Sequence, residues 1–431
     1  MAVHVFVGPS CPEPLVRKYH PDFVLHAPVR HGDLFSQALA AGDVAVIVDG
    51  VYHHSLALRH KEILDALERR ITILGAASIG ALRAAELDEL GMIGVGRVYD
   101  WYRDGVFDGD DAVSVAHSET SSPVGINIPL VNLHAAVLAA ADAGVLTREA
   151  GRRLLARLER EYYPLRTVGR ILALANECGE SAFADWYAGH VATDPAAFDQ
   201  KRADALQAFA LAELLDSPPR VTPVPTMKMV RDWRTEFHRR WRNRFAPVDP
   251  LMQPRIAYQQ IFAADFPDVW WGFLHRSSDP AFASSSDGFP AHVLRHLGPT
   301  AARWLDDPAL RSRITTLLCP LPDLADSREA ELLLRRESAQ DRARVTDWMR
   351  RTQHHLDTHP ARSLAQITDA TCARLLARIW DVHTDKELAV ECGRRGFPSL
   401  RQAAVALRPF AIGYLGSLQQ ARTGRGGEAR G

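Results

Sequence analysis

Short, almost uninterrupted apolar runs alternate with helical patterns over the first 130 residues, and this alternation constrains the fold more than any other feature. The runs lie at 3–7, 44–48 and 71–74, with a weaker one at 23–25, and apolar residues recur at helical spacing over 57–70 and 79–90. Strands that are apolar on both faces and alternate with helices are typical of a parallel sheet covered on both sides. The pattern predicts a small α/β domain.

After residue 130 the strand pattern disappears, and helices are predicted at 131–141, 148–161, 168–176 and 197–215. Four prolines within 217–225 predict a linker, because proline removes a backbone donor and favours extended chain. We therefore expect an α/β core at about 1–130 that helices extend to a domain at 1–217. A mostly α-helical domain of unknown role is expected at 226–422, and a Gly/Arg-rich, disordered tail at 423–431.

Composition excludes several classes of protein. Lys and Arg total 51 against 52 Asp and Glu, which disfavours a general nucleic-acid binder. No apolar run approaches the roughly 18 residues that a membrane span needs. Five scattered cysteines without a C-x-x-C pair support neither a disulfide framework nor a cysteine zinc site. The histidines lack the spacing of a zinc site, and no glycine-rich nucleotide motif is present, so we expect a cytoplasmic protein without metal or cofactor.

The segment 74–86 is the most informative candidate for chemistry. It passes from an apolar run through small residues directly into a helical pattern, at the carboxyl end of a strand, where ligands bind in open parallel sheets. Ser78 stands where a strand–turn–helix elbow presents a nucleophile, next to helix N–H groups that can bind an oxyanion. In the alternative interpretation Ser78 caps the helix, and the small residues allow close packing of helix on sheet.

Other polar residues follow the predicted strands or open the predicted helices. His60, beside Lys61 and Glu62, is either an acid–base group held by a carboxylate or part of an exposed first turn. The pair 110–111 is either a metal or base-orienting site or a solvated acidic turn. Cys11 is expected in a strand-end loop outside the core, a position that a sulfur-handling protein can use.

An aromatic stripe recurs every four residues in the second half. It comprises Trp233, Phe237, Trp241 and Phe245, interleaved with Arg231, Arg234, Arg239, Arg240, Arg242 and Arg244. Such a stripe is typical of a core or a partner interface, with arginine stems covering the aromatic rings. Contact with an acidic protein or a nucleic acid is the alternative, and the balanced overall charge makes nucleic acid the weakest hypothesis.

In order and spacing, the segments 7–10, 28–33, 49–50 and 60–64 resemble the TfuA-like family. The segment 75–87, GAASIGALRAAEL, is similar to that family's most distinctive motif, usually GASSMGALRAAEL, and residues 91–111 extend the match. The resemblance is firm over about 1–130 and continues less distinctly to 201–205. Ala77 replaces a serine of the motif and Ile79 a methionine, while Val29 and His31 depart from the pattern around Arg30.

This resemblance implies a role in forming thioamides. TfuA-like proteins accompany YcaO-type enzymes, which use ATP to activate a peptide backbone amide. The resemblance further implies that the chain delivers sulfur by hydrolysing the C-terminal thiocarboxylate of a ThiS-type, ubiquitin-like sulfur carrier, so that sulfide is released near the YcaO partner. The expected final substrate is a ribosomal peptide held by that partner.

Hydrolysis of a thiocarboxylate is an acyl transfer, which needs a nucleophile, a base and donors for an oxyanion. In this hypothesis Ser78 is the nucleophile or an anion-binding hydroxyl, His60 or His117 is the base, and Asp49 or Glu62 orients it. Substrate binding is assigned to Gly8, Ser10, Arg30, Asp33, Lys61, Arg83, Glu86 and Arg103, with Arg30 or Arg83 holding the thiocarboxylate. The alternative is a non-catalytic adaptor that binds carrier and YcaO enzyme, in which Ser78 caps a helix and Arg83 pairs with Glu86.

Overall fold

A computed structural model describes residues 2–35, 38–51, 56–116, 127–215, 235–245, 249–277, 288–324 and 326–427. The chain divides into two compact units, Met1–His238 and Arg239–Gly431. The predicted linker at 217–225 lies outside the described residues. Within the described ranges, no helix combines the length and the apolar character needed to cross a bilayer.

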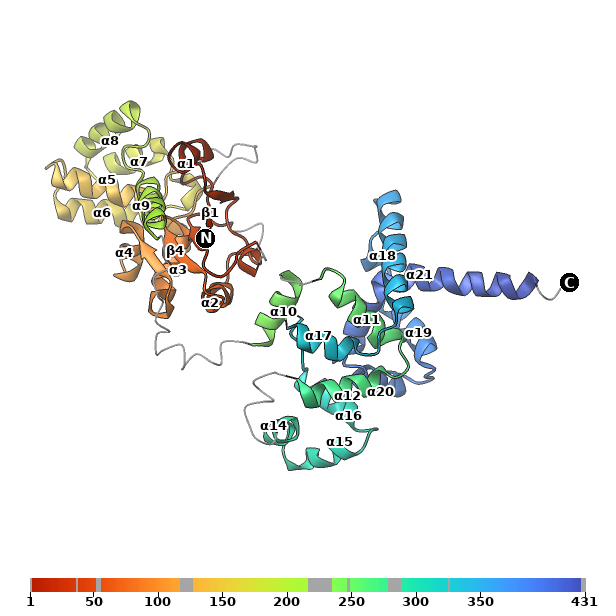
Figure 1. The fold of residues 1–431 in the computed structure, drawn as a ribbon. Coiled ribbons are helices and arrows are strands. Elements are labelled where there is room, and N and C mark those ends of the chain that lie inside the picture. Colours follow the sequence, from red (N-terminus) through yellow and green to blue (C-terminus); the bar gives the residue numbers. More distant parts are fainter. Residues whose placement is uncertain are drawn as a thin grey trace. The chain divides into compact units, whose positions relative to one another are not determined.

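The first unit contains a five-stranded parallel sheet in the order β2-β1-β3-β4-β5 (Figure 1). Its strands are β1 (Val3–Phe6), β2 (Val24–His26), β3 (Val44–Ile47), β4 (Thr72–Ala76) and β5 (Ile93–Val95). Every residue of β3 and β4 is buried, as their apolar runs predict for central strands covered on both sides. The predicted α/β class is confirmed, and β5 is an additional edge strand that the sequence pattern does not reveal.

Helices cover both faces of this sheet. The helices of the first unit are α1 (Glu13–Tyr19), α2 (His60–Glu68), α3 (Ile79–Leu87), α4 (Arg97–Arg103), α5 (Leu130–Asp142), α6 (Arg148–Glu159), α7 (Val168–Glu177), α8 (Ser181–Thr193) and α9 (Gln200–Leu214). On one face, Ile63 of α2 and Ile79 of α3 pack on Ile47. On the other face, Ala208 and Phe209 of α9 pack with Val46, Leu74 and neighbouring strand residues.

The approach of α3 to the sheet is unusually close. A Cβ atom on Gly80 would lie 1.8 Å from the carbonyl oxygen of Ile47 in β3, and one on Gly75 would lie 2.2 Å from the carbonyl oxygen of Gly80. No side chain fits such a gap, so both positions require glycine. The small residues of the 74–86 segment therefore do permit close packing of helix on sheet.

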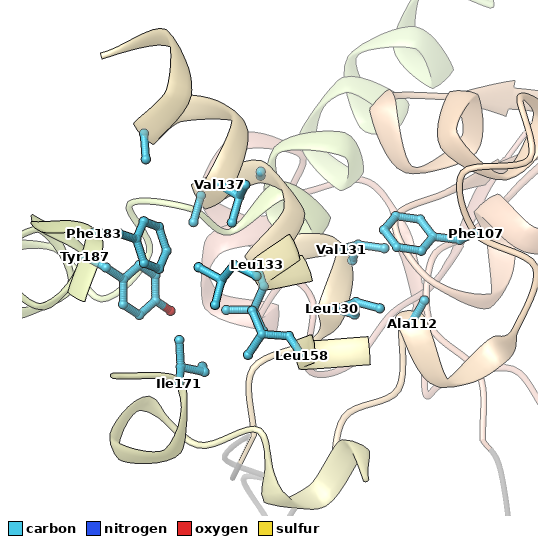
Figure 2. Packing of buried hydrophobic residues seen from close by; sticks show 14 of the residues in the cluster. Phe107, Ala112, Leu130, Val131, Leu133, Val137, Leu158, Ile171, Phe183 and Tyr187 are labelled. Carbon is cyan, nitrogen blue, oxygen red and sulfur yellow. The ribbon is translucent and has the colours of Figure 1, made fainter. Parts of the chain in front are cut away.

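Helices α5–α8 form a second core beside the sheet (Figure 1). Figure 2 shows Leu133 and Val137 of α5 grouped with Phe183 and Tyr187 of α8, while Leu130 and Val131 lie toward Phe107. This core fixes the start of α5 and the end of α8, which both contribute to the site described below.

Arg166 connects this helical core to the acidic pair at 110–111. Its guanidinium is 1% exposed and donates to the carbonyl oxygens of Leu158, Glu159 and Glu161 near the end of α6. It also donates to the carbonyl oxygen of Asp111 at 3.2 Å and to the Asp111 carboxylate at 2.8 Å. The pair forms a short 3₁₀ turn, Asp110–Ala112, that is held by this arginine. Nowhere in the described ranges are three or more His, Cys, Asp or Glu side chains grouped to hold a metal ion.

The described part of the second unit is helical, which confirms the expected mostly α-helical region. Its helices are α11 (Met252–Phe262), α12 (Phe266–Arg276), α14 (Gly288–Leu297), α15 (Ala302–Asp306), α16 (Arg311–Leu318), α17 (Ser327–Leu334), α18 (Ala339–Thr358), α19 (Asp369–Trp380), α20 (Asp385–Arg394) and α21 (Leu400–Gly427), while α10 (Glu236–Phe245) spans the boundary between the units. Helix α21 thus runs into the segment where the sequence predicts a tail.

The arginines of the aromatic stripe are partly engaged within the second unit. Arg242 pairs with Asp323 at 3.1 Å, and Arg239 donates to the carbonyl oxygen of Leu321. Arginines with partners inside the unit favour the first interpretation, in which arginine stems cover the aromatic rings. They disfavour the alternative of a nucleic-acid contact, which needs arginines available for phosphates. Trp233, Arg231 and Arg234 lie outside the described residues.

Candidate functional site

The carboxyl ends of three neighbouring strands lie in one row. Phe6 of β1 is opposite Ile47 of β3, and Ile47 is opposite Gly75 of β4, so the chain leaves these strands at one level. From β1 the chain passes outward to β2 and then returns to the other side of β1 to form β3. This reversal of strand order creates the crevice in which open α/β sheets bind their ligands.

Asp49 is the centre of the crevice between β1 and β3. Its carboxylate is 4% exposed and accepts the backbone N–H groups of Gly8 at 2.9 Å and Ser10 at 3.0 Å. The Ser10 hydroxyl donates to the other carboxylate oxygen, Oδ1, at 2.6 Å. Three predicted site residues are therefore brought together, and a single buried carboxylate holds the loop after β1 against the end of β3.

Lys201, on the first turn of α9, completes this cluster. Its side chain is almost completely buried, its ammonium donates to the carbonyl oxygen of Val113 at 2.8 Å, and Nζ lies 3.9 Å from Asp49 Oδ1. Burial lowers the Lys201 pKa, and the nearby carboxylates of Asp49 and Asp199 oppose that shift. Lys201 was not assigned to the site, and its only signal was the indistinct resemblance over 201–205.

A pocket of about 160 Å³ opens beside Ser10 and Lys201. Its lining comprises Pro9, Ser10, Val115, Asn127, Ile128, Pro129, Asn132, Tyr187, Val191, Pro195, Phe198, Asp199 and Lys201. Asn127 braces the segment after Val113, since its side chain bonds to the backbone of Ser114 and Ala116. Asp199 caps α9 and also accepts the Asn132 amide at 3.1 Å. The pocket thus lies between the loop after β1 and the helical core.

Ser78 lies at the predicted junction of β4 and α3. The residue in the left-handed conformation is its neighbour Ala77, with φ of 66°, at the position where the family motif usually has serine. Ser78 begins α3, yet its side chain makes no capping hydrogen bond, and it is 3% exposed. The strained turn of an elbow is therefore present, but Ala77 occupies it instead of Ser78, and the Ser78 hydroxyl does not form the capping bond of the alternative interpretation.

His60 lies with Arg83 and Glu86 in a partly exposed ion cluster. His60 Nε2 is 2.8 Å from Glu86 Oε2, and Arg83 donates to the same oxygen at 2.5 Å. Burial acts to raise the Glu86 pKa, but the hydrogen bonds from His60 and Arg83 outweigh it, and the pKa is lowered. Among the described contacts, His60 is not paired with Ser78, and the Arg83–Glu86 ion pair expected for an adaptor is present.

Glu62 is fully buried, and its carboxylate bonds to the loop after β2 and does not orient His60. It accepts the backbone N–H of Gly32 at 2.6 Å and of Arg59 at 3.2 Å, and it pairs with His31 Nδ1. Burial raises the Glu62 pKa, and the hydrogen bonds from His31 and the backbone oppose that shift. Glu62 therefore shapes the loop that carries Arg30.

The remaining predicted residues lie apart from the pocket lining. Asp33 accepts the Arg30 backbone N–H at 2.7 Å. Lys61 donates to the Thr235 hydroxyl at 2.6 Å, and Arg103 pairs with carboxylates at both Asp100 and Asp104. His117, the second candidate base, lies outside the described residues.

Cys11 was expected outside the core, and that expectation is wrong. Its side chain is completely buried among Val7, Val16 and Phe209, and burial raises the thiol pKa to about 11. A thiol in that state is a poor nucleophile near neutral pH, because only the thiolate reacts.

Alkylation of the native protein is expected to spare Cys11. Iodoacetamide should modify the partly exposed Cys178 well before Cys11, which should react only after denaturation. Mass spectrometry of the digested protein gives the order of labelling. Equal rates at the two residues in the native state would contradict the buried position of Cys11.

The fold and the crevice define a doubly wound α/β protein with a pocket beside the point where its strand order reverses, which is where such folds bind ligands. Residues 49–167 match the model of the TfuA-like protein family, so the chain carries a TfuA-like region, in agreement with the resemblance of its motifs. No curated protein matches the chain significantly. The TfuA-like family is associated with YcaO enzymes, so the match supports a role connected with YcaO-dependent thioamidation in general.

Proposed function

We propose that this protein supplies sulfur for YcaO-dependent thioamidation by hydrolysing the C-terminal thiocarboxylate of a ThiS-type carrier. The observation that carries the proposal is the cluster of a hydroxyl, a carboxylate and a buried ammonium at Ser10, Asp49 and Lys201, of which Ser10 and Lys201 line the pocket. Acyl transfer from an anionic chain end needs a nucleophile, a proton acceptor and a positive charge near the developing oxyanion. The crevice offers all three in one place.

The overall reaction consumes one water molecule. The C–S bond of the carrier's thiocarboxylate breaks, a C–O bond forms, and the products are the carrier's carboxylate and hydrogen sulfide. Nothing is oxidised or reduced, and ATP is used only by the YcaO partner to activate the peptide amide. The peptide itself meets the YcaO enzyme and not this pocket.

The test is sulfide release from a thiocarboxylated carrier by the full-length protein, without YcaO enzyme or ATP. Wild-type protein should release sulfide over many turnovers and convert the carrier to its carboxylate, as seen by mass spectrometry. Ser78→Ala and His60→Ala, made in parallel, test whether the β4–α3 elbow takes part. Release that is abolished in Ser78→Ala, with folding intact, would place chemistry at that elbow, whereas a loss in His60→Ala alone would place it at the ion cluster with Glu86 and Arg83.

The adaptor function is the second candidate, and one observation favours it. The predicted base His60 is paired with Glu86 and Arg83 on a partly exposed surface, a cluster suited to docking a partner. If the wild-type protein binds the carrier but releases no sulfide alone, while sulfide appears when the YcaO enzyme is added, the chain is an adaptor and the hydrolase proposal fails.

A further inference from the structure

Two arginine side chains of the second unit meet over one glycine. Arg276 is the last residue of α12, and Arg335 directly follows the last turn of α17. A Cβ atom added to Gly272 would lie 2.7 Å from Arg276 Nη2, and 3.3 and 3.4 Å from the two terminal nitrogens of Arg335. Both guanidinium groups therefore occupy the space that the missing side chain of Gly272 leaves.

The donors of these two groups are largely unused. An arginine in the last turn of a helix often donates to the carbonyl oxygens there. Among the described residues, Arg276 makes no hydrogen bond and no ion pair, and Arg335 makes only a long hydrogen bond of 3.5 Å to the carbonyl oxygen of Asp268. A guanidinium carries five donors, so the pair presents most of its donors to an added acceptor.

The local charge also favours an added anion. Partial desolvation lowers the Arg335 pKa, the charges of Arg276 and Arg336 lower it further, and Asp265 and Asp268 oppose the shift. Asp265 is itself paired with Arg336 at 2.6 Å. Two cations held side by side repel each other, and a carboxylate bound between them would relieve that repulsion.

A third arginine and a small pocket adjoin the pair. The Arg311 guanidinium lies 4.3 Å from the ring centre of Trp271, the residue before Gly272. Burial lowers the pKa of His275, and Arg311 and Arg276 lower it further, so both charges act at that ring. The pocket, of about 40 Å³, has apolar walls from Pro267, Trp270, Trp271 and Pro308, and Arg311 and Asp268 also line it. Because Arg335 reaches the carbonyl oxygen of Asp268, the arginine pair and the pocket are contiguous.

We infer that this surface of the second unit docks an acidic peptide segment: Arg276 and Arg335 bind one carboxylate, Arg311 binds a neighbouring one, and the pocket takes an apolar side chain. The planar guanidinium fork matches a carboxylate in two parallel hydrogen bonds. The pocket volume of about 40 Å³ limits the apolar side chain to a small one. This role belongs to the second unit and does not rest on the proposed function.

The same surface fits a nucleic acid poorly. The Trp271 ring already contacts Arg311, His275 and Phe289, which leaves it badly placed to stack on a base. Asp265 and Asp268 stand beside the arginines and would repel a chain that carries a phosphate at every residue. A peptide carries carboxylates only at chosen positions, so it can face the arginines with charge and the two aspartates without it.

The test is fluorescence anisotropy of labelled peptides with the full-length protein. The probe is a glycine/serine peptide with glutamates around a single valine, and its matched control has glutamine in place of glutamate. Wild-type protein should bind the glutamate peptide about tenfold more tightly or better, and added salt should reduce the difference because exposed charges are screened. Replacing the valine with glycine should weaken binding about threefold or more, since the apolar side chain is lost.

Substitutions in the protein locate the binding. Arg276→Met and Arg335→Met should each weaken binding of the glutamate peptide about fivefold or more, because each removes one charged donor group. Gly272→Asp should weaken it at least as much, since it places a carboxylate of the protein where the two guanidinium groups meet. The fold should tolerate this change, because the atoms in the way are the ends of two flexible side chains.

Matched controls make the same changes elsewhere in the second unit. Arg350 on α18 is 72% exposed and pairs with Asp347 of the same helix, and a Cβ on Gly416 of α21 would have nothing within 4 Å. Arg350→Met and Gly416→Asp should therefore bind the glutamate peptide as wild type does. Circular dichroism should show native helix content in every variant.

The outcomes decide the inference on their own. Equal binding of the glutamate and glutamine peptides by wild type, or binding of neither, would overturn it, as would unchanged binding in folded Arg276→Met, Arg335→Met and Gly272→Asp. Displacement of the probe by inorganic phosphate or an oligonucleotide at lower concentrations than by the unlabelled glutamate peptide would overturn it in favour of a phosphate ligand. The assay contains no sulfur carrier, so a failure here leaves the proposed function untouched.

Discussion

Replacing Gly80 with alanine is expected to destabilise the first unit by about 3 kcal/mol or more. The new Cβ would lie 1.8 Å from the carbonyl oxygen of Ile47 and 2.7 Å from its carbonyl carbon. Those atoms belong to the backbone of a central strand, so no side-chain rotation relieves the clash, and α3 must move away from the sheet. Urea unfolding of the full-length protein, followed by circular dichroism, measures the loss.

Gly189→Ala is the matched control, because it makes the same change inside another helix. Gly189 lies in α8, is exposed, and has nothing within 4 Å of the added Cβ. This substitution should stabilise the protein by roughly 0.5–1 kcal/mol, since alanine is the better helix former. Wild-type stability in Gly80→Ala would show that α3 does not pack as closely as the structure describes.

Arg166→Met is expected to cost about 3–5 kcal/mol of stability. Among the described residues, the Arg166 guanidinium donates hydrogen bonds to four carbonyl oxygens and one carboxylate, and the substitution removes all of these bonds. The methionine fills similar volume but offers no donor, and although the carbonyl oxygens of Leu158 and Asp111 keep backbone N–H donors, all five acceptors lose the guanidinium. Arg166→Lys should recover only part of the loss, since an ammonium has three donors in place of the guanidinium's five. Thermal and urea unfolding give the two values.

The control for this change is Arg152→Met, on the exposed face of α6. The Arg152 side chain is 76% exposed, and its one ion pair among the described residues is with Glu149, three residues earlier in the same helix. Its loss should leave stability nearly unchanged. A similar cost for the two substitutions would mean that Arg166 does not hold the turn at Asp110–Ala112.

Periodicity predicted the central strands and most helices of the first unit, because residues buried on both sides leave an unbroken apolar pattern. It failed where elements are short or lie at edges. Strand β5 has three partly buried residues with glycine in the middle, and α1 begins after Pro12 with mixed polarity. Helix α8 was also missed, since its alanine and aromatic residues alternate without a clear polar face.

The candidate site was predicted only in part. The residues after β1 and β3 were identified because ligand sites lie at the carboxyl ends of parallel strands, and Asp49 does meet Ser10 there. The pairing of Glu62 with His31, and of His60 with Glu86, depends on tertiary packing between loops and helices far apart in sequence. Lys201 was overlooked because a lysine on the first turn of a helix is normally solvated.

The packing of α9 on the sheet also has a consequence for the synthesis and expression of the chain. Helix α9 supplies both Lys201 and the apolar side chains that cover one face of the strands, yet it lies beyond residue 167, where the family match ends. During synthesis, the strands therefore leave the ribosome long before their cover does, and that apolar face stays available to chaperones until α9 arrives. A fragment trimmed to the matched segment, 49–167, would lack β1, β2 and β3 as well as α9, so expression boundaries for this region belong before Val3 and after Leu214.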